Sequence, residues 1–320
     1  WPIYECNLGL TYGKLIKPDW DKMIEHCQRA VELRRDTPTD PYGLDYYYDF
    51  LAEAYFRAGK LKKFEDEFEK IGDLKNEPKN EARIYNRIGN LLAKGQKEQE
   101  AIIYYEKAIE LDSESPIYAC NLGLTYGKLP KPDLDKMIEH FSRAVELSRR
   151  MPDEYGLSYY YEYLAEGYFK ANRLREFEDI FEKSEDLKDK PEEKARIYNR
   201  IGNLFFETYE NKKSIPYYKK ATELAPAIAV YYANLGGTYR ELKQWDESNE
   251  AYLTAVKIEP NNVGYHNSLG NIYYEIGNWE EAKKSYSMAI ELDNQPIFLC
   301  NLGRAYGNLG QLNEMIKYCS

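Results

Sequence analysis

Residues 234–260 read NLGGTYRELKQWDESNEAYLTAVKIEP, and the order of small and large residues in this stretch predicts a pair of helices. Gly236 follows an apolar residue, and the bulky Tyr239 comes three residues later. Further along, an aromatic residue at Tyr252 is followed by alanine, and Pro260 closes the stretch. Residues three and four apart share one face of a helix, whereas proline ends one. We therefore expect a helical hairpin whose helices approach closely at the glycine.

The same pattern recurs along the whole chain at a nearly constant period. An apolar residue followed by glycine or alanine returns nine times, and the spacings between the small residues are 43, 37, 34, 42, 37, 34, 34 and 33. The nine small residues are Gly9, Ala52, Gly89, Gly123, Ala165, Gly202, Gly236, Gly270 and Gly303. Such a period is typical of stacked units, because each helix pair leaves an apolar side that the next pair buries. The sequence therefore predicts an all-α array.

This pattern resembles the tetratricopeptide repeat (TPR), a helix–turn–helix unit of 34 residues. The resemblance covers nearly the whole chain and implies a right-handed superhelical solenoid of antiparallel helix pairs. We expect a single array over residues 1–320, with units that start near residues 2, 45, 82, 116, 158, 195, 229, 263 and 296. Because the ninth unit is truncated, we expect the chain to be a fragment of a longer protein.

A longer duplication is superimposed on this short period. Residues 1–36 and 115–150 agree at 28 of 36 positions, and both copies run on to ARIYNRIGNL, at Ala82 and Ala195. Several units in these copies are longer than 34 residues, since the turns LIKPDW and LPKPDL carry extra residues and prolines that disfavour helix. Repeat arrays of this kind generally provide a binding surface rather than catalytic chemistry.

Composition narrows the class of partner. The chain has 43% hydrophobic and 31% charged residues, and its formal net charge is −10. An acidic chain is a poor ligand for nucleic acid or for an anionic membrane, so we expect neither as a partner. No apolar run has the length of a membrane span. The five cysteines follow the repeat rather than a disulfide plan, which indicates a reducing, cytoplasmic location.

The search for catalytic chemistry yields no candidate. The three histidines, His26, His140 and His266, have no second ligand at metal-binding spacing, and we expect them at the surface. No phosphate-binding glycine loop follows a strand, and no nucleophile lies beside a base in a recognisable motif. We therefore expect no catalytic residue, no metal, no cofactor and no enzymatic activity in this segment.

One polar stripe is a candidate binding surface. In RIYNRIGN, two arginines and two asparagines lie at i, i+3, i+4 and i+7, opposite the apolar Tyr85, Ile88 and Leu92. Asparagine is a mediocre helix former, so its recurrence on one helix face indicates a use or a recent common origin. The candidate peptide-binding residues are Arg83, Asn86, Arg87, Asn90, Asn121, Arg196, Asn199, Arg200, Asn203, Asn234, Asn267 and Asn271.

The TPR resemblance implies that these positions line the concave groove, which the first helix of each unit forms. The asparagine before Leu-Gly is similar to the asparagine ladder in the TPR superhelix of O-linked N-acetylglucosamine transferases, where amides bind an extended peptide backbone. An amide both donates and accepts hydrogen bonds, and neighbouring arginines add charge-assisted bonds to acidic side chains. The alternative is that the amides bridge neighbouring repeats or face water.

The resulting expectation is a non-catalytic scaffold that binds an extended, acidic peptide of a protein partner in the groove. A second hypothesis is a targeting or regulatory array of a larger enzyme or sensor whose catalytic domain lies outside the segment. A third is a self-assembly module that associates end to end, because the C-terminal residues Ile316–Ser320 are expected to leave apolar surface uncovered.

Overall fold

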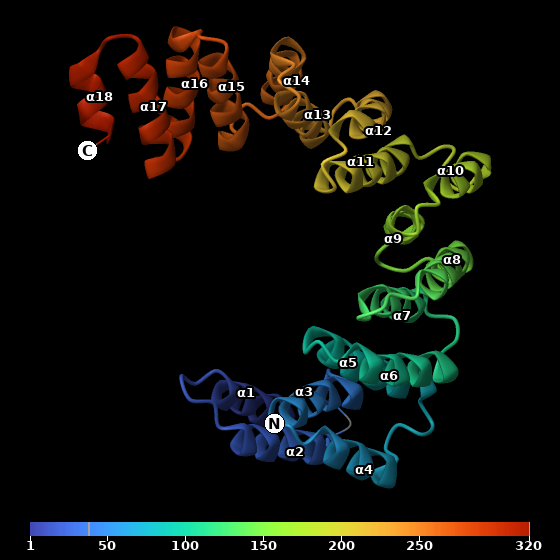
Figure 1. The fold of residues 1–320 in the computed structure, drawn as a ribbon. Helices are drawn as coiled ribbons and strands as arrows, with labels where there is room; N and C mark the ends of the chain where they lie inside the picture. Colours follow the sequence, from blue (N-terminus) through green and yellow to red (C-terminus); the bar gives the residue numbers. More distant parts are fainter. Residues whose placement is uncertain (38, 320) are drawn as a thin grey trace. The chain divides into compact units, whose positions relative to one another are not determined.

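The computed structural model describes residues 1–37 and 39–319, which form eighteen helices and no strand. Figure 1 shows consecutive helices lying side by side as hairpins. The chain separates into two compact units, unit 1 over residues 1–171 and unit 2 over residues 172–320. The all-α solenoid of antiparallel helix pairs is confirmed, whereas the division of the chain into nine repeats of one array stays a prediction.

Unit 1 contains nine helices. They are α1 (Pro2–Gly13), α2 (Trp20–Asp36), α3 (Leu44–Arg57), α4 (Leu61–Ile71), α5 (Pro78–Lys94), α6 (Glu98–Leu111), α7 (Pro116–Lys128), α8 (Leu134–Arg150) and α9 (Leu157–Lys170). The pairs α1–α2, α5–α6 and α7–α8 are tightly packed hairpins, and α3 packs between α2 and α5.

Unit 2 contains the other nine described helices. They are α10 (Leu174–Lys183), α11 (Pro191–Glu207), α12 (Asn211–Leu224), α13 (Ala229–Glu241), α14 (Trp245–Ile258), α15 (Val263–Glu275), α16 (Trp279–Leu292), α17 (Pro296–Asn308) and α18 (Leu312–Cys319). In both units the odd-numbered helices are the first helices of the pairs and form what we call the first-helix face. The even-numbered helices form the second-helix face.

Local sequence explains where the helices begin and end. The first helix α5 begins at Pro78, four residues before the expected start, since the fixed φ of proline suits the first helical position. The same helix ends before Gln96, which has a left-handed φ of 58°. In the long turn before α2, the Asp19 carboxylate accepts a hydrogen bond of 3.1 Å from the backbone N–H of Lys22 and caps the helix.

The small residues of the repeat leave room for an aromatic ring of the second helix. A Cβ atom at Gly89 would lie 2.7 Å from the ring of Tyr105, and one at Gly123 would lie 2.8 Å from the ring of Phe141. Both rings are almost completely buried. The close helix contact expected at the glycine is therefore present, and it places the polar side of each first helix toward solvent.

Candidate functional site

The predicted binding residues all lie on first helices, and all are exposed or half-buried. Tyr85, Ile88 and Leu92, on the opposite side of α5, are buried. The polar stripe is thus open to a ligand on the first-helix face. Its use in peptide binding stays a prediction.

The asparagines of consecutive first helices are hydrogen-bonded to one another. Nδ2 of Asn121 in α7 donates to Oδ1 of Asn86 in α5 at 2.9 Å. In unit 2, Asn234 of α13 donates in the same way to Asn199 of α11 at 2.8 Å. A third pair joins α17 to Asn267 of α15 at 3.0 Å. We call these three contacts the amide pairs, and they are the bridges between repeats that formed the alternative interpretation of the stripe.

The amide pairs leave hydrogen-bonding capacity unused. A primary amide has two donor hydrogens and two acceptor lone pairs, and a pair consumes one donor and one acceptor. The half-buried Asn86 and Asn121 retain a free donor and a free acceptor, respectively, with respect to the described residues. Bridging between repeats and binding of a peptide backbone are therefore compatible uses of the same amides.

A second set of asparagines is held by tyrosines of the second helices. The Tyr105 hydroxyl donates to Oδ1 of Asn90 at 2.8 Å, and Tyr218 donates to Asn203 at the same distance. Each tyrosine reaches the first-helix face past the repeat glycine, and burial raises the pKa of Tyr105 to about 12. The contact uses the amide oxygen of Asn90 and Asn203, so the NH₂ groups of both remain able to donate hydrogen bonds.

The arginines of α5 already have carboxylate partners. Arg83 contacts Asp45 at 2.6 Å and Asp49 at 3.3 Å, and Arg87 contacts Glu53 at 2.6 Å, so three carboxylates of α3 face two guanidinium groups. Burial raises the pKa of Asp49, although both arginines oppose that shift. Arg83 and Arg87 are therefore less available to an acidic ligand than their sequence pattern indicates.

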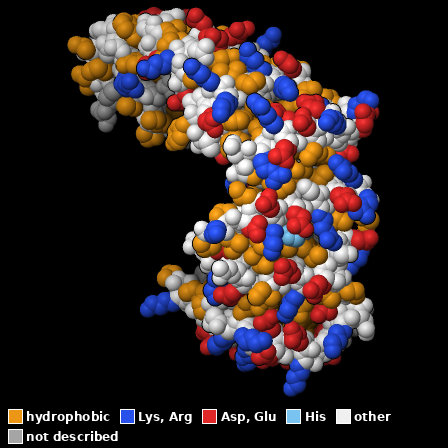
Figure 2. All heavy atoms as spheres, turned by 45° about the vertical axis from the view of Figure 1, so that its right-hand side comes forward, with side chains coloured by type: hydrophobic (Ala, Val, Ile, Leu, Met, Phe, Trp, Pro, Cys, Tyr) orange, Lys and Arg blue, Asp and Glu red, His pale blue; other side chains and the backbone are white. Residues whose placement is uncertain are grey.

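The same pairing of opposite charges is seen elsewhere on the surface. In unit 2, Arg200 lies 3.3 Å from Glu207, whose side chain is exposed. Figure 2 shows basic and acidic side chains interspersed on the face it presents. This view shows no extended field of one sign, which means that local groups must provide any charge selectivity.

A pocket of about 280 Å³ opens between α11 and α13 in unit 2. The amides of Asn203 and Asn234 lie in its wall, and Arg240 lines it as well. Its remaining lining is Phe206, Glu207, Tyr218, Ala233, Gly237 and Tyr252. The pocket combines apolar and aromatic surface with a few polar groups, which is the usual character of a ligand site.

The binding residues predicted from the sequence did not include Arg240. This arginine lies 3.0 Å from the exposed Glu241. It belongs to the pocket only because α13 packs beside α11 in the folded chain. A signal was present, because Ala233, Gly237 and Arg240 lie at i, i+4 and i+7 on α13, beside Asn234. The two smallest residues of this row leave the space that the pocket occupies.

The expectation that all three histidines lie at the surface is wrong for one of them. His266 is buried rather than at the surface, and its Nε2 lies 2.7 Å from the carbonyl oxygen of Pro260. Cys300 is exposed, whereas Cys6 and Cys120, its equivalents in two earlier repeats, are buried.

Among residues 1–37 and 39–319, no group of three histidines, cysteines or acids is arranged to hold a metal ion. None of the described helices has the combination of length and hydropathy that a membrane span requires.

Comparisons with known proteins place repeats in both units. The family model described as tetratricopeptide repeat matches residues 82–115 and 195–228, and the model described as TPR repeat matches residues 236–277 and 270–310. No curated protein matches the chain. A solved structure described as "YrrB: a TPR protein with an unusual peptide-binding site" is 16% identical, with a TM-score of 0.35 over 70% of this chain and 92% of that one. MamA protein is 21% identical, with a TM-score of 0.37 over 67% of this chain and 92% of that one.

Proposed function

Because the chain is a tetratricopeptide-repeat protein, we propose that it is a protein-interaction scaffold that binds an extended peptide of a partner along its first-helix face. The observation that carries the proposal is the pocket of about 280 Å³ at which two amides, Asn203 and Asn234, meet Arg240. The scaffold itself performs no catalytic step in this proposal.

Peptide backbone suits the amides. An extended peptide presents alternating N–H and C=O groups. Oδ1 of Asn203 already accepts from Tyr218 and Asn234, and Nδ2 of Asn234 already donates to Asn199 and Asn203. The NH₂ group of Asn203 is therefore left to donate to a peptide C=O, and Oδ1 of Asn234 is left to accept from a peptide N–H. Asn203 is oriented by Tyr218 and Asn234 by Asn199, at 2.8 Å in both contacts. Because these side chains are already ordered, little conformational entropy is lost on binding.

The acidic character proposed for the ligand rests on Arg240 rather than on α5. Arg83 and Arg87 are paired with carboxylates of α3, whereas the carboxylate beside Arg240, Glu241, is exposed and adjacent in sequence. An exposed ion pair is worth only about 0–1 kcal/mol and is easily exchanged. An aspartate or glutamate side chain of the peptide can therefore replace Glu241 as the partner of Arg240.

Selection from a display library of random twelve-residue peptides tests the proposal. We expect the selected peptides to be enriched in aspartate or glutamate and to lose about thirtyfold in affinity when Asn203→Ala and Asn234→Ala are combined, since two hydrogen bonds of about 1 kcal/mol each are removed. Arg240→Gln should weaken binding of the acidic peptides and reduce its salt dependence.

The matched control is Asn261→Ala, an exposed asparagine of the same unit that makes no part of the pocket. Circular dichroism confirms that each variant keeps its helix content. Selected peptides that bind the double variant as tightly as the wild type would exclude the first-helix face of unit 2. A library that yields no binder would exclude the peptide-scaffold proposal.

A further inference from the structure

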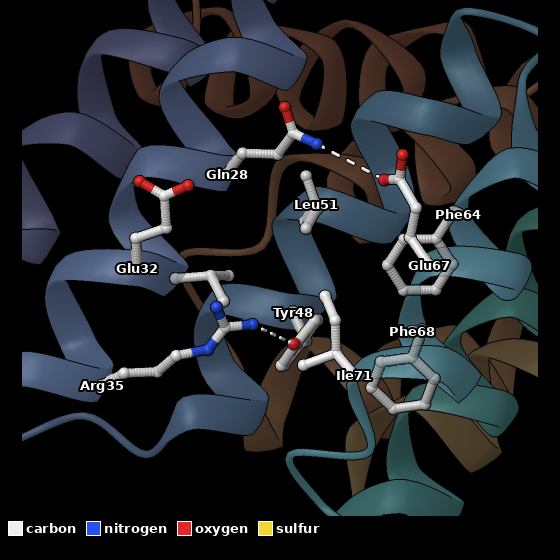
Figure 3. A pocket seen from close by; sticks show the side chains of 10 residues that line it. Gln28, Glu32, Arg35, Tyr48, Leu51, Phe64, Glu67, Phe68 and Ile71 are labelled. Carbon is white, nitrogen blue, oxygen red and sulfur yellow. Dashed lines mark hydrogen bonds between the residues drawn. The ribbon is translucent and has the colours of Figure 1, made fainter.

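Two clefts lie at equivalent places on the second-helix faces of the two units. In unit 1, the cleft runs between α2 and α4 over α3 and has a volume of about 70 Å³ (Figure 3). In unit 2, it runs between α12 and α14 over α13 and has a volume of about 410 Å³. In each unit a first helix lies beneath the cleft, and its residues there occupy equivalent positions of the repeat. They are Tyr48, Leu51 and Tyr55 in α3 and Tyr232, Leu235 and Tyr239 in α13.

In unit 1, hydrogen bonds between side chains of α2, α3 and α4 bridge the cleft. Gln28 of α2 donates to the Tyr55 hydroxyl at 2.8 Å, and Tyr55 donates to Glu67 of α4 at 2.6 Å. Gln28 also reaches Glu67 directly at 3.4 Å, as the dashed line in Figure 3 shows. Tyr48 is engaged as well, because it accepts from Arg35 at 3.0 Å. The polar groups around this cleft are therefore satisfied within the protein.

The cleft of unit 2 lacks the residues that close its counterpart. Ala251 of α14 stands where α4 has Glu67, and Lys219 of α12 stands where α2 has Gln28. Tyr239 lines the cleft and is 8% exposed, yet its hydroxyl has no hydrogen-bond partner among the described residues. The ring of Tyr239 is buried, whereas its hydroxyl oxygen is open to the cleft. The hydroxyl is therefore available to a hydrogen-bonding group from outside the chain.

Three carboxylates line the same cleft as this hydroxyl. Glu223 of α12 and Glu247 and Glu250 of α14 line the cleft, all three are exposed, and none forms an ion pair with a described residue. The lining carries one cation, Lys219, so its net charge is negative. Carboxylates and a hydroxyl oxygen accept hydrogen bonds, and tyrosine faces attract cations. The complementary group is therefore a cation with several donors.

We propose that the cleft between α12 and α14 binds an arginine side chain presented by a basic segment of a protein partner. The guanidinium group has five donors in a planar fork, so it can pair with Glu247 and Glu250 and still donate to Tyr239. Its plane stacks on a tyrosine ring, and its aliphatic stem covers Leu235 and Ala251. This site does not depend on peptide binding at the first-helix face, because the two surfaces use different residues of the helices that they share, and opposite charge.

A titration with short peptides tests the proposal. The probe is an acetylated and amidated decapeptide with three arginines separated by glycine and alanine, followed by fluorescence anisotropy with the full chain. The matched probe carries citrulline, a neutral analogue of arginine, at the same three positions. We expect the arginine peptide to bind at least tenfold more tightly than the citrulline peptide. A lysine peptide should bind several-fold more weakly than the arginine peptide, since its ammonium group cannot form the fork.

The protein variants localise the effect. Combined Glu223→Gln, Glu247→Gln and Glu250→Gln should weaken the arginine peptide about tenfold, and Tyr239→Phe should weaken it a few-fold. The control removes the same charge from α6 of unit 1 with Glu98→Gln, Glu100→Gln and Glu110→Gln, and it should change affinity little. Asn203→Ala with Asn234→Ala should leave arginine binding unchanged, which separates this site from the first-helix face.

Three results would overturn the assignment. Equal losses in the two triple variants would show that the peptide responds only to overall charge. Equal binding of the citrulline peptide would remove the guanidinium group from the interaction, and equal binding of the lysine peptide would remove the preference for arginine. Thermal unfolding of each variant by circular dichroism checks that the loss is not one of folding.

Discussion

The Tyr218 hydroxyl donates a hydrogen bond of 2.8 Å to Asn203, and it reaches that amide only because Gly202 has no side chain. A Cβ atom at Gly202 would lie 2.6 Å from the tyrosine ring. Tyr218 is 2% exposed, so its ring is packed against neighbouring residues over nearly all of its surface. The packing of the hairpin and the orientation of a candidate binding amide therefore depend on one missing side chain.

Gly202→Ala should destabilise the α11–α12 hairpin. Alanine gains about 1 kcal/mol over glycine in a helix interior, but overpacking a filled core costs about 1–3 kcal/mol. The expected net loss is roughly 1 kcal/mol, and it should be local because each repeat contacts only its neighbours. Hydrogen exchange measures it as faster exchange of the α12 amides.

Gly264→Ala is the matched control. A Cβ atom at Gly264, near the start of α15, would meet only Oδ1 of Asn262, at an ordinary distance of 3.4 Å. Without the clash, the helix preference of alanine should leave stability equal or higher. A Gly202→Ala protein that exchanges as slowly as this control would contradict the close approach of Tyr218.

The amide pair between Asn199 and Asn234 should show a measurable coupling. The two side chains lie on adjacent first helices and share a hydrogen bond of 2.8 Å. Such a bond contributes about 0.5–1.5 kcal/mol, and a double-mutant cycle isolates it. We expect the combined alanine substitutions to cost less than the sum of the single ones by about that amount, measured by urea denaturation. Additive losses would mean that the amides are held for another purpose.

The sequence predicts the fold well because the fold depends on local patterns. Gly89 and the apolar Ile88 indicate a close helix contact, and the structure has both buried in α5. Pro18, in the turn before α2, indicates a break in the helix, and α1 ends at Gly13. The start of α5 was missed by four residues, since its first turn at Pro78 carries no apolar residue to extend the pattern.

The candidate site was only partly predictable, because its properties depend on residues far apart in the chain. The stripe identifies Arg83 as polar and accessible, but nothing near it in sequence indicates that Asp45, on another helix, lies 2.6 Å away. The missing partner of Tyr239 is likewise visible only when α13 is compared with α3, where Glu67 bonds the equivalent Tyr55. Periodicity predicts the helix face on which a residue lies, but the neighbouring helix determines which side chains it contacts.

Stability near Asp49 should depend on pH in the direction opposite to that of an ordinary ion pair. Burial raises the pKa of Asp49 above the value of an unfolded aspartate, about 3.9. Between those two values the folded state binds more protons, so it loses stability as the pH rises through that interval. Asp49→Asn removes this loss, and the stability of the variant relative to the wild type should increase from acid to neutral pH in urea denaturation.

The exposed Asp189→Asn serves as a control for the removal of one negative charge. If Asp49→Asn instead becomes less stable than the wild type as the pH rises, attraction by Arg83 and Arg87 outweighs the cost of burial. The α3 carboxylates would then be the main restraint on the two arginines.

Reaction with Ellman's reagent should separate the cysteines of the repeat. Cys300 is exposed, whereas Cys6, Cys27 and Cys120 are at most 1% exposed, and burial raises the pKa of Cys120. Because the thiolate is the reactive form, a buried thiol with a raised pKa reacts slowly. In a Cys319→Ser background, we expect one thiol to react rapidly in the native protein and the other three only after urea unfolds it. The rapid reaction should disappear in Cys300→Ser, and rapid reaction of a second thiol would show that the first-helix packing around Cys6 or Cys120 opens in solution.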